Sequence, residues 1–203
     1  MQSLAASSSG AAPRPLPGRK RSEQAREAVI AATLGTLREV GYRQLTVEGV
    51  AARAGVAKAT IYRWWPSKAS LSVEALGQDL GVPLQPTGDT RVDIRAMVDR
   101  IVTAVGGLFG DIVVADFAGD PLAGPRLEDL LGPYRAAHSA ILLGAAGRGD
   151  LPHNIDAGKI LDLISGVVLY RKLMRRPVDG SVADELVTLI LSGQLPRMPS
   201  LPR

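Results

Sequence analysis

Residues 46–68 read TVEGVAARAGVAKATIYRWWPSK and contain two short helical patterns separated by a glycine. The first pattern follows Thr46, whose side chain suits a helix N-cap, and its apolar residues are spaced for one buried face. Gly55 interrupts the pattern, and a second short helix is expected over residues 57–64. Two short helices joined by a glycine-containing turn can cross steeply when the turn residue tolerates a positive φ. The segment therefore predicts a helix-turn-helix.

Further helices are expected on both sides of this motif. A helical pattern opens at Ser22, a plausible N-cap, and closes at Gly41 as a C-cap. Pro66 ends the second helix of the motif, and Ser67 caps a fourth helix. Four helices thus precede residue 81. Their expected core includes Val50, Val56, Ile61 and Trp65.

The stretch Gly81–Asp89 carries two prolines and two glycines, and we expect a domain boundary there. The elements expected beyond it are a helix capped by Asp89 or Thr90, a short element near Ile112–Phe117, a helix ending near Ala146, a long helix over Asp156–Met174, and a last helix to Gly193 opened by a Ser181-x-x-Asp184 capping box. The helix ending near Ala146 is either kinked or begins at Pro133, and two pieces are favoured. Because no strand pattern or repeat is evident, the prediction is an all-α protein of about nine helices.

Composition supports a helical globular protein. Of the 203 residues, 46% are apolar and only 4% aromatic, so the core is expected to be aliphatic. The absence of cysteine excludes disulfides, thiolate metal sites and a cysteine nucleophile. No apolar run approaches the roughly 18 residues of a membrane span, and no export signal is evident. The expected location is therefore the cytoplasm, without contact with a membrane.

Charge is distributed unevenly along the chain. Residues 1–76 hold 11 Lys and Arg against 5 Asp and Glu, a net charge of +6. Residues 77–203 hold 13 against 15, a net charge of −2. A basic end on an acidic-leaning remainder is typical of nucleic-acid contact confined to one end, although many solvated faces are also basic.

An enzymatic function is disfavoured. The two histidines, His138 and His153, lie 15 residues apart without metal-ligand spacing or a recognisable triad. Neither a phosphate-binding G-x-x-x-x-G-K-[ST] motif nor a G-x-G-x-x-G motif occurs. We therefore predict no catalytic residues, no metal and no cofactor.

The helix-turn-helix segment resembles the DNA-binding domain of the TetR family. The resemblance rests on the Thr46 start, the Ala54-Gly55-Val56 turn, Thr60-Ile61-Tyr62, and the Trp65-x-x-Lys68 ending, and it extends over residues 22 to about 76. It implies a sequence-specific transcriptional regulator. The expected division is a disordered basic arm over residues 1–21, a DNA-binding domain over 22–80, and a dimerisation and ligand-binding domain over 81–203.

The resemblance also assigns roles to residues. It implies phosphate contacts by Thr46, Thr60, Tyr62 and Lys68, and a major-groove face made by Lys58, Ala59, Arg63 and Trp64. Arg63 is the natural guanine reader through O6 and N7. Trp64 is either a thymine-methyl and sugar contact, slightly favoured, or a packing residue on the first helix, whereas Trp65 is expected in the core. Ala57 stands where the family usually has a Ser that caps the recognition helix, so that cap is lost or supplied otherwise, at a cost of about 1 kcal/mol.

The C-terminal half resembles a TetR regulatory subclass more faintly, through Arg148-Gly149-Asp150-Leu151, Asp156 and Tyr170-Arg171 before a proline. This implies that helices 157–174 and 182–193 pair with their twins in a homodimer. Suitable apolar residues are Ile160, Ile164, Val167, Val168, Leu189 and Ile190, although each also fits an internal core.

A pocket for a small apolar ligand is likewise implied. It would lie between helices 90–109, 126–146 and 157–174, lined by Phe109, Tyr134, His138 and Tyr170, with an ordinary core or surface histidine as the alternative for His138. The expected partners are therefore double-stranded DNA with a palindromic operator, a second copy of the chain, and this ligand. The alternative function is a helical protein-binding adaptor that keeps the fold without binding an operator.

Overall fold

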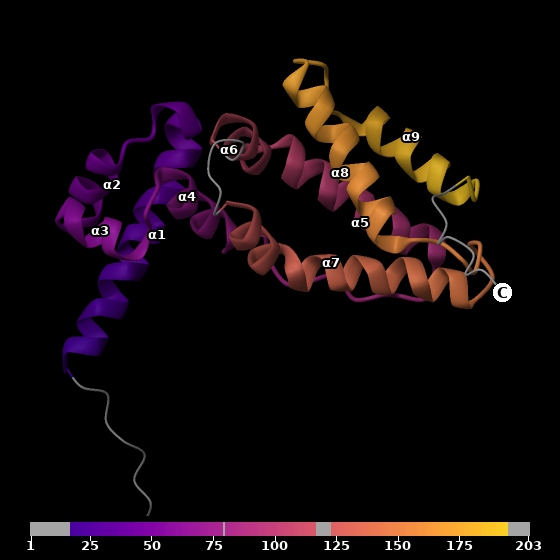
Figure 1. Ribbon diagram of the computed structural model, residues 1–203, viewed down its shortest axis with the longest axis horizontal. Helices are drawn as coiled ribbons and strands as arrows, with labels where there is room; N and C mark the ends of the chain where they lie inside the picture. The colour runs from indigo at the N-terminus through magenta and orange to yellow at the C-terminus, as the bar shows by residue number, and fades with distance from the viewer. Residues whose placement is uncertain (1–16, 79, 117–122, 195–203) are drawn as a thin grey trace, which may run out of the picture.

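The computed structural model describes residues 17–78, 80–116 and 123–194 and is all-α over these ranges (Figure 1). The helices are α1 (Pro17–Gln44), α2 (Val47–Ala54), α3 (Lys58–Trp64), α4 (Lys68–Gly77), α5 (Thr90–Gly106), α6 (Leu108–Asp116), α7 (Ala123–Gly147), α8 (Ala157–Leu173) and α9 (Gly180–Leu191). In the described part of the chain, the predicted all-α class and the number of helices are confirmed.

The helices pack around two hydrophobic cores. One core unites α1 to α4, and the other unites α5 with α7, α8 and α9. Helix α6 follows α5 in the sequence, yet its Phe109 and Ile112 are buried in the first core. The amino-terminal half of α7 also packs there through Leu127, Leu130 and Leu131. The two halves of the molecule are therefore joined by α6 and α7 as well as by the 81–89 segment.

Helix α4 approaches α7 closely at its last residue. A Cβ on Gly77 would lie only 2.7 Å from Cδ1 of Leu130, so a larger residue there would force the Leu130 side chain to move. This close approach brings the end of α4 next to the second half of the protein, as Figure 1 shows.

Two helix boundaries differ from the sequence prediction. Helix α1 begins at Pro17 rather than at Ser22, so residues 17–21, which were expected in the basic arm, are helical. Proline is favoured in the first turn of a helix, where no intrahelical partner is needed for its missing N–H. Gly41 has φ 75° and interrupts α1 as expected, but helical structure resumes up to Gln44. The rest of the predicted arm, like Phe117, lies outside the described residues.

Helix α7 is continuous through Pro133, whereas two pieces were predicted. A proline disfavours helical backbone at the preceding residue mainly through a clash with that residue's Cβ and N–H. The preceding residue here is Gly132, which has no Cβ and has open space around it. The helix therefore accommodates the proline.

The helix N-caps follow the sequence in most cases. Ser67 forms a reciprocal capping box with Ser70, and Asp89 rather than Thr90 caps α5 by accepting from the Val92 N–H at 3.0 Å. The last helix is the exception, because Asp179 caps α9 and the predicted Ser181-x-x-Asp184 box does not form. The Asp179 carboxylate accepts from both the N–H and the hydroxyl of Ser181.

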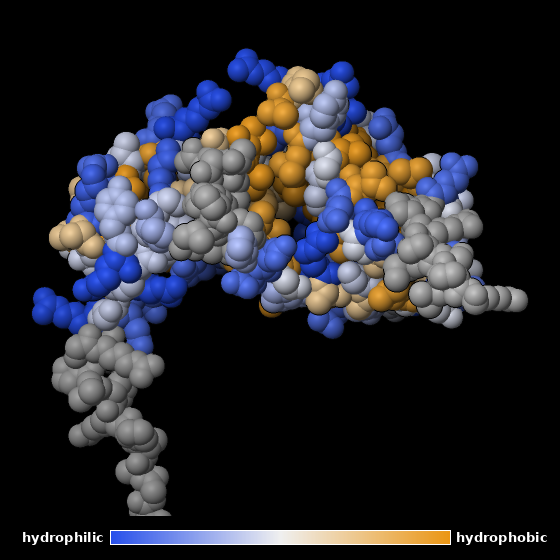
Figure 2. Space-filling model, viewed as in Figure 1, coloured by the Kyte–Doolittle hydropathy of each residue, from blue (hydrophilic) through white to orange (hydrophobic). Residues whose placement is uncertain are grey.

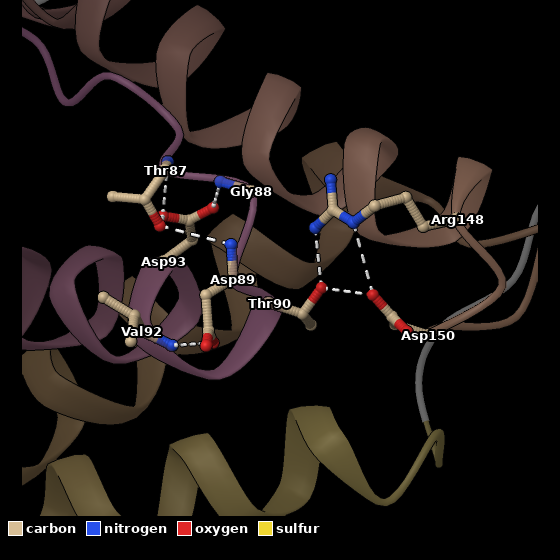
Figure 3. A network of polar contacts seen from close by, with 8 residues as sticks. All are labelled: Thr87, Gly88, Asp89, Thr90, Val92, Asp93, Arg148 and Asp150. Carbon is tan, nitrogen blue, oxygen red and sulfur yellow. Dashed lines mark hydrogen bonds and ion pairs between the residues drawn. The ribbon is translucent and has the colours of Figure 1, made fainter.

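The start of α5 is held by a polar network (Figure 3). The buried carboxylate of Asp93 accepts from the Thr87 N–H at 2.8 Å, from the Thr87 hydroxyl at 2.7 Å and from the Gly88 N–H at 3.1 Å. Burial raises the pKa of Asp93, but these hydrogen bonds and the charge of Arg148 outweigh it, so the pKa lies below its usual value. The end of the Gly- and Pro-rich segment is thus anchored to α5.

Candidate functional site

The turn between α2 and α3 has the predicted geometry. Thr46 is the N-cap of α2, and its Oγ1 accepts from the Gly49 N–H at 3.1 Å. Gly55 adopts φ 67° as the C-cap, a conformation that a side chain would strain. Val50 and Ile61 are buried between the helices. These contacts fix α3 relative to α2.

Helix α3 exposes the side chains that the sequence assigned to DNA. Lys58, Ala59, Tyr62 and Arg63 are exposed, and Thr60 is half-buried. Ala57 precedes the helix in extended conformation without a side-chain hydrogen bond, so the loss of the cap is confirmed. No side chain at Ala57 therefore caps the first N–H groups of α3, of which that of Thr60 donates to the Ala57 carbonyl at 2.9 Å.

Lys58 is engaged within the motif. Its Nζ forms an ion pair with the Glu48 carboxylate of α2 and lies 5.5 Å from the centre of the Tyr62 ring. The hydrogen bond raises the pKa of Lys58 and lowers that of Glu48. A phosphate or a base would have to compete with Glu48 for this ammonium group.

The two tryptophans have different environments. Trp65 is buried, as expected, and its Nε1–H donates to Oε2 of Glu74 at 2.6 Å. Trp64 is partly buried and packs edge-on against Trp65, with ring centroids 5.5 Å apart. The Arg63 guanidinium lies 5.3 Å from the centre of the Trp64 ring. Trp64 thus packs against Trp65 and Arg63, and a direct base contact by its ring stays a prediction.

Lys68, the first residue of α4, holds the end of α1. Its Nζ donates to the Tyr42 carbonyl at 3.2 Å and lies 4.2 Å from the centre of the Tyr42 ring. The predicted phosphate contact would be made by an ammonium group already held between α1 and α4, which reduces the entropy lost on binding.

Sequence reasoning missed Glu74, which ties α4 to the rest of the motif. Besides accepting from Trp65, its carboxylate forms an ion pair with Arg26 of α1, whose guanidinium lies 5.6 Å from the centre of the Trp65 ring. The sequence signal for Glu74 was that it is a lone acidic residue in a basic segment. Through this contact the end of α3 is attached to the helix that leads into the second half of the protein.

A cavity lies between α5, α7 and α8 and beside α6. Its volume is about 70 Å³, and it is lined by Leu80, Arg100, Ile101, Ala104, Val105, Phe109, Leu131, Tyr134, Arg135, His138, Leu161 and Ser165. Three of the four predicted pocket residues, Phe109, Tyr134 and His138, are therefore brought together. Tyr170 is not, because it is 52% exposed on the outer face of α8, and its predicted place in the pocket is wrong.

Two polar side chains of the cavity hold the backbone that follows α4. The Arg100 guanidinium donates to the Leu80 carbonyl, and the Tyr134 hydroxyl donates to the Gly81 carbonyl at 2.7 Å. Arg100 was not predicted, although its position next to the buried Ile101 on α5 was a signal. Two side chains that line the cavity thus also hold the linker between the two halves in place.

His138 is buried beside these groups. Its Nε2 has no hydrogen-bond partner among the described residues. Burial lowers the pKa of His138 to about 4, and the charges of Arg100 and Arg135 contribute. The imidazole is therefore neutral at physiological pH.

Both halves of the chain match known families. Residues 29–75 match bacterial regulatory proteins of the tetR family, and residues 84–190, more than half of the chain, match the tetracyclin repressor-like C-terminal domain. The chain belongs to the TetR family. It is accordingly a DNA-binding transcriptional regulator, and the protein-binding adaptor considered from the sequence is set aside.

Individual TetR-family proteins agree with this assignment. An uncharacterized regulator of Bacillus subtilis, YdeS, is 30% identical over 87% of this chain and 92% of its own length. The DNA-binding transcriptional repressor TetR of Mycobacteroides abscessus is 29% identical over 84% of this chain and 94% of its own. The crystal structure of the TetR-family regulator SCO0332 superimposes with a TM-score of 0.67 at 31% identity, covering 84% of this chain and 98% of that one.

The outer face of α8 carries an apolar stripe in this TetR-family protein. Leu163, Val167, Tyr170 and Leu173 follow at helical spacing, and Leu189 of α9 is exposed nearby. Figure 2 shows hydrophobic side chains gathered over α8 and α9. Four of the residues first considered for a dimer interface instead belong to the protomer's own core, namely Ile160, Ile164, Val168 and Ile190.

The motif shared with TetR regulatory domains has a structural role. Arg148 donates to the Thr90 hydroxyl at 2.6 Å and pairs with Asp150, so the turn after α7 is tied to the start of α5 (Figure 3). Gly149 adopts φ 85° in this turn, and Asp156 caps α8. None of the described helices has the length and apolar character needed to cross a membrane.

Proposed function

We propose that this protein is a homodimeric repressor that binds a palindromic operator and is released by a small, largely apolar ligand. One observation carries the proposal: the segment that follows α4 connects the proposed DNA-binding helices to the wall of the cavity. Arg100 and Tyr134 line the cavity and hold the carbonyls of Leu80 and Gly81, while α4, which ends just before them, begins at Lys68 on the DNA-binding side.

DNA recognition is proposed for the exposed side of α3. Arg63 would read a guanine, Lys58 and Ala59 would face the major groove, and Thr46, Thr60, Tyr62 and Lys68 would contact phosphates. The exposure of Lys58, Ala59, Tyr62 and Arg63 supports these roles. One seven-residue helix reads few base pairs, so two copies on adjacent half-sites supply the specificity.

Ligand binding must enlarge the cavity. Its volume of about 70 Å³ is well below the roughly 300–1,000 Å³ of typical ligand pockets. Expansion would move the groups that close it, Arg100 and Tyr134 included, and would free the segment after α4. Two regulators that share the fold at low identity have ligands in their crystals, stearoyl-CoA in FadR and resorcinol in RolR. Because these two ligands differ, they support the presence of a ligand site but do not indicate which molecule this protein binds.

The energetic requirement is modest. A ligand that favours the non-binding arrangement by about 1–3 kcal/mol lowers operator affinity about 5- to 150-fold, and bound operator weakens the ligand by the same factor. Releasing one or two backbone carbonyls from their donors is a change of this size.

The test measures operator affinity with and without a ligand. Duplexes selected from a random-sequence pool supply the operator, thermal-shift screening supplies compounds that stabilise the protein, and fluorescence anisotropy reports binding. We expect a stabilising compound to weaken operator binding and bound operator to weaken the compound. A compound that stabilises the protein and leaves operator affinity unchanged would overturn the release mechanism. Failure to select any duplex would overturn operator binding itself.

A further inference from the structure

Arg100 brings to the cavity a positive charge that no carboxylate of the described residues neutralises. Among the described residues, no carboxylate pairs with the guanidinium of Arg100, whose contacts are the Leu80 carbonyl and the Tyr134 ring at 5.7 Å. Arg95 of the same helix is paired with Asp99 and Asp184. An unpaired cation beside an apolar cavity favours the binding of an anion.

Arg135 at the cavity differs from Arg100. It donates to Oδ1 of Asp162 at 2.8 Å, so its charge is largely compensated within the protein. It still lies close enough to His138 to disfavour the protonated imidazole. The local field is therefore positive and would repel an amine.

His138 supplies a second polar group. Its side chain is 94% buried and lines the cavity, while Nε2 is without a hydrogen-bond partner. A buried polar atom without a partner costs about 1–3 kcal/mol. A ligand oxygen beside Nε2 would remove that cost, since a neutral imidazole with its proton on Nε2 donates to an acceptor.

The rest of the lining is mostly apolar. It comprises Leu80, Ile101, Ala104, Val105, Phe109, Leu131 and Leu161, together with the polar Ser165. A molecule that fits this lining must therefore present a mainly hydrocarbon surface away from its polar group.

We propose that the effector is a small monocarboxylate with an aromatic or aliphatic body, whose carboxylate accepts hydrogen bonds from Arg100 and from Nε2 of His138. Arg100 would exchange the Leu80 carbonyl for the carboxylate, because a guanidinium binds an ionised carboxylate, with both partners charged, more strongly than it binds a neutral carbonyl. Recognition of the ligand and release of the linker are then one event. This inference rests on the proposed function and adds the charge of its ligand.

Matched pairs of acids and amides test the charge directly. Benzoate and benzamide, and hexanoate and hexanamide, are compared on the full-length protein by thermal shift and calorimetry. We expect each acid to bind at least about tenfold more tightly than its amide, since hydrogen bonds to charged groups are the stronger ones. Equal binding of acid and amide, or no binding by either acid, would overturn the proposal.

Two variants locate the effect. Arg100→Gln should abolish the preference for the acid, whereas Arg95→Gln, the same change on an ion-paired arginine of α5, should leave it intact. An unchanged preference in Arg100→Gln would overturn the assignment.

A measurement on the unmodified protein covers the case in which Arg100→Gln fails to fold. The chain has two histidines, His138 in the cavity and His153 exposed, so ring-¹⁵N spectra contain two sets of signals. We expect benzoate to shift the nitrogen signals of His138 and to leave those of His153 unchanged. Binding without a shift at His138 would contradict the proposed contact.

The outcomes separate this inference from the function on which it rests. Operator release by a neutral compound, with no response to the acids, would support the ligand-released repressor and overturn the carboxylate. Acid binding at His138 without any change in operator affinity would support the carboxylate site and overturn the release mechanism.

Discussion

Single side chains act at both ends of the molecule. On the DNA-binding side, Arg63 rests on a tryptophan ring, and Lys68 is fixed by the Tyr42 carbonyl. In the second half, a buried imidazole lies beside arginines that disfavour its charge. The consequences of each can be measured by changing one residue.

Substitutions of Arg63 and Lys68 are expected to affect DNA binding in different ways. Arg63→Ala should cost about 1–3 kcal/mol on the preferred operator and relax the preference at one base position. Lys68→Ala should weaken binding to all sequences and reduce the salt dependence by about one phosphate. Affinities for selected and scrambled duplexes over a salt series distinguish the two. Equal loss of specific and non-specific binding in both variants would refute this division of roles.

His138 is expected to make stability depend on pH. Its pKa falls from 6.5 to about 4 on folding, so the unfolded chain takes up a proton first as the pH drops. The folded state should therefore lose roughly 2 kcal/mol between pH 7 and pH 5, at 1.36 kcal/mol per pKa unit, and most of the loss should be absent in His138→Leu. Urea unfolding at both pH values measures this. The same pH dependence in both proteins would show that other groups are responsible.

The position and stability of a whole helix depend on whether the backbone groups at its ends have hydrogen-bond partners. Helices α2 and α4 have side-chain caps, whereas α3, which carries the proposed base-reading residues, has none at Ala57. The position of α3 is instead set by its own buried Ile61, which packs in the same core as Val50 of α2, and by Trp65 at its end. Helix α3 is thus held from its sides and its carboxyl end.

Ala57→Ser should supply the missing cap. Ala57 has φ −71° and ψ 142°, the extended conformation of an N-cap residue, so a serine side chain there can accept from the N–H of Ala59 or Thr60 in the first turn of α3. We expect the free energy of unfolding to rise by about 1 kcal/mol. Ala59→Ser, inside the same helix, is the control and should give no gain. A stability in Ala57→Ser no higher than in the control would contradict the capping argument.

At the scale of the whole molecule, the two cores are linked in three ways. Helix α6 inserts into the DNA-binding core, the 81–89 segment is held by the cavity wall and by Asp93, and Lys172 of α8 donates to the Gly107 carbonyl at 2.9 Å and pairs with Asp111 of α6. The helix proposed for dimerisation is therefore in contact with an element of the DNA-binding core. A change at the proposed dimer interface would act on the first core through these contacts of Lys172 with α6.

The dimer is expected to form through the exposed stripe of α8. Leu163→Glu puts a charge in that interface and should yield a monomer that binds the operator weakly, because a single half-site lacks the second contact. Leu143→Glu, on the outer face of α7 and exposed to a similar extent, should remain dimeric. Light scattering at micromolar concentration gives the mass of each. A monomeric parent protein, or a dimeric Leu163→Glu variant, would show that the dimer does not form in this way.

Local features of this protein were readable from the amino-acid order. The Thr46 cap and the Gly55 turn depend on neighbours within a few residues, so helix periodicity and capping chemistry predict them. The errors at Ser22 and Pro133 are of the same local kind. Helix α1 begins before Ser22 because Pro17 is a favourable first residue of a helix. Helix α7 continues through Pro133 because the residue before it is Gly132.

Only the tertiary structure decided which faces of the helices meet. Tyr170 and Ile164 lie on the same apolar helix, but packing against α5 buries Ile164 and leaves Tyr170 outside. The hydrogen bond from Arg100 to the carbonyl of Leu80, 20 residues earlier, likewise depends on how α5 and α7 cross beside the linker. Periodicity shows that a helix has an apolar side, but the angle and the offset at which helices pack follow from how all their side chains interlock. The cavity and the outer dimerisation stripe therefore emerge only when all the helices are assembled.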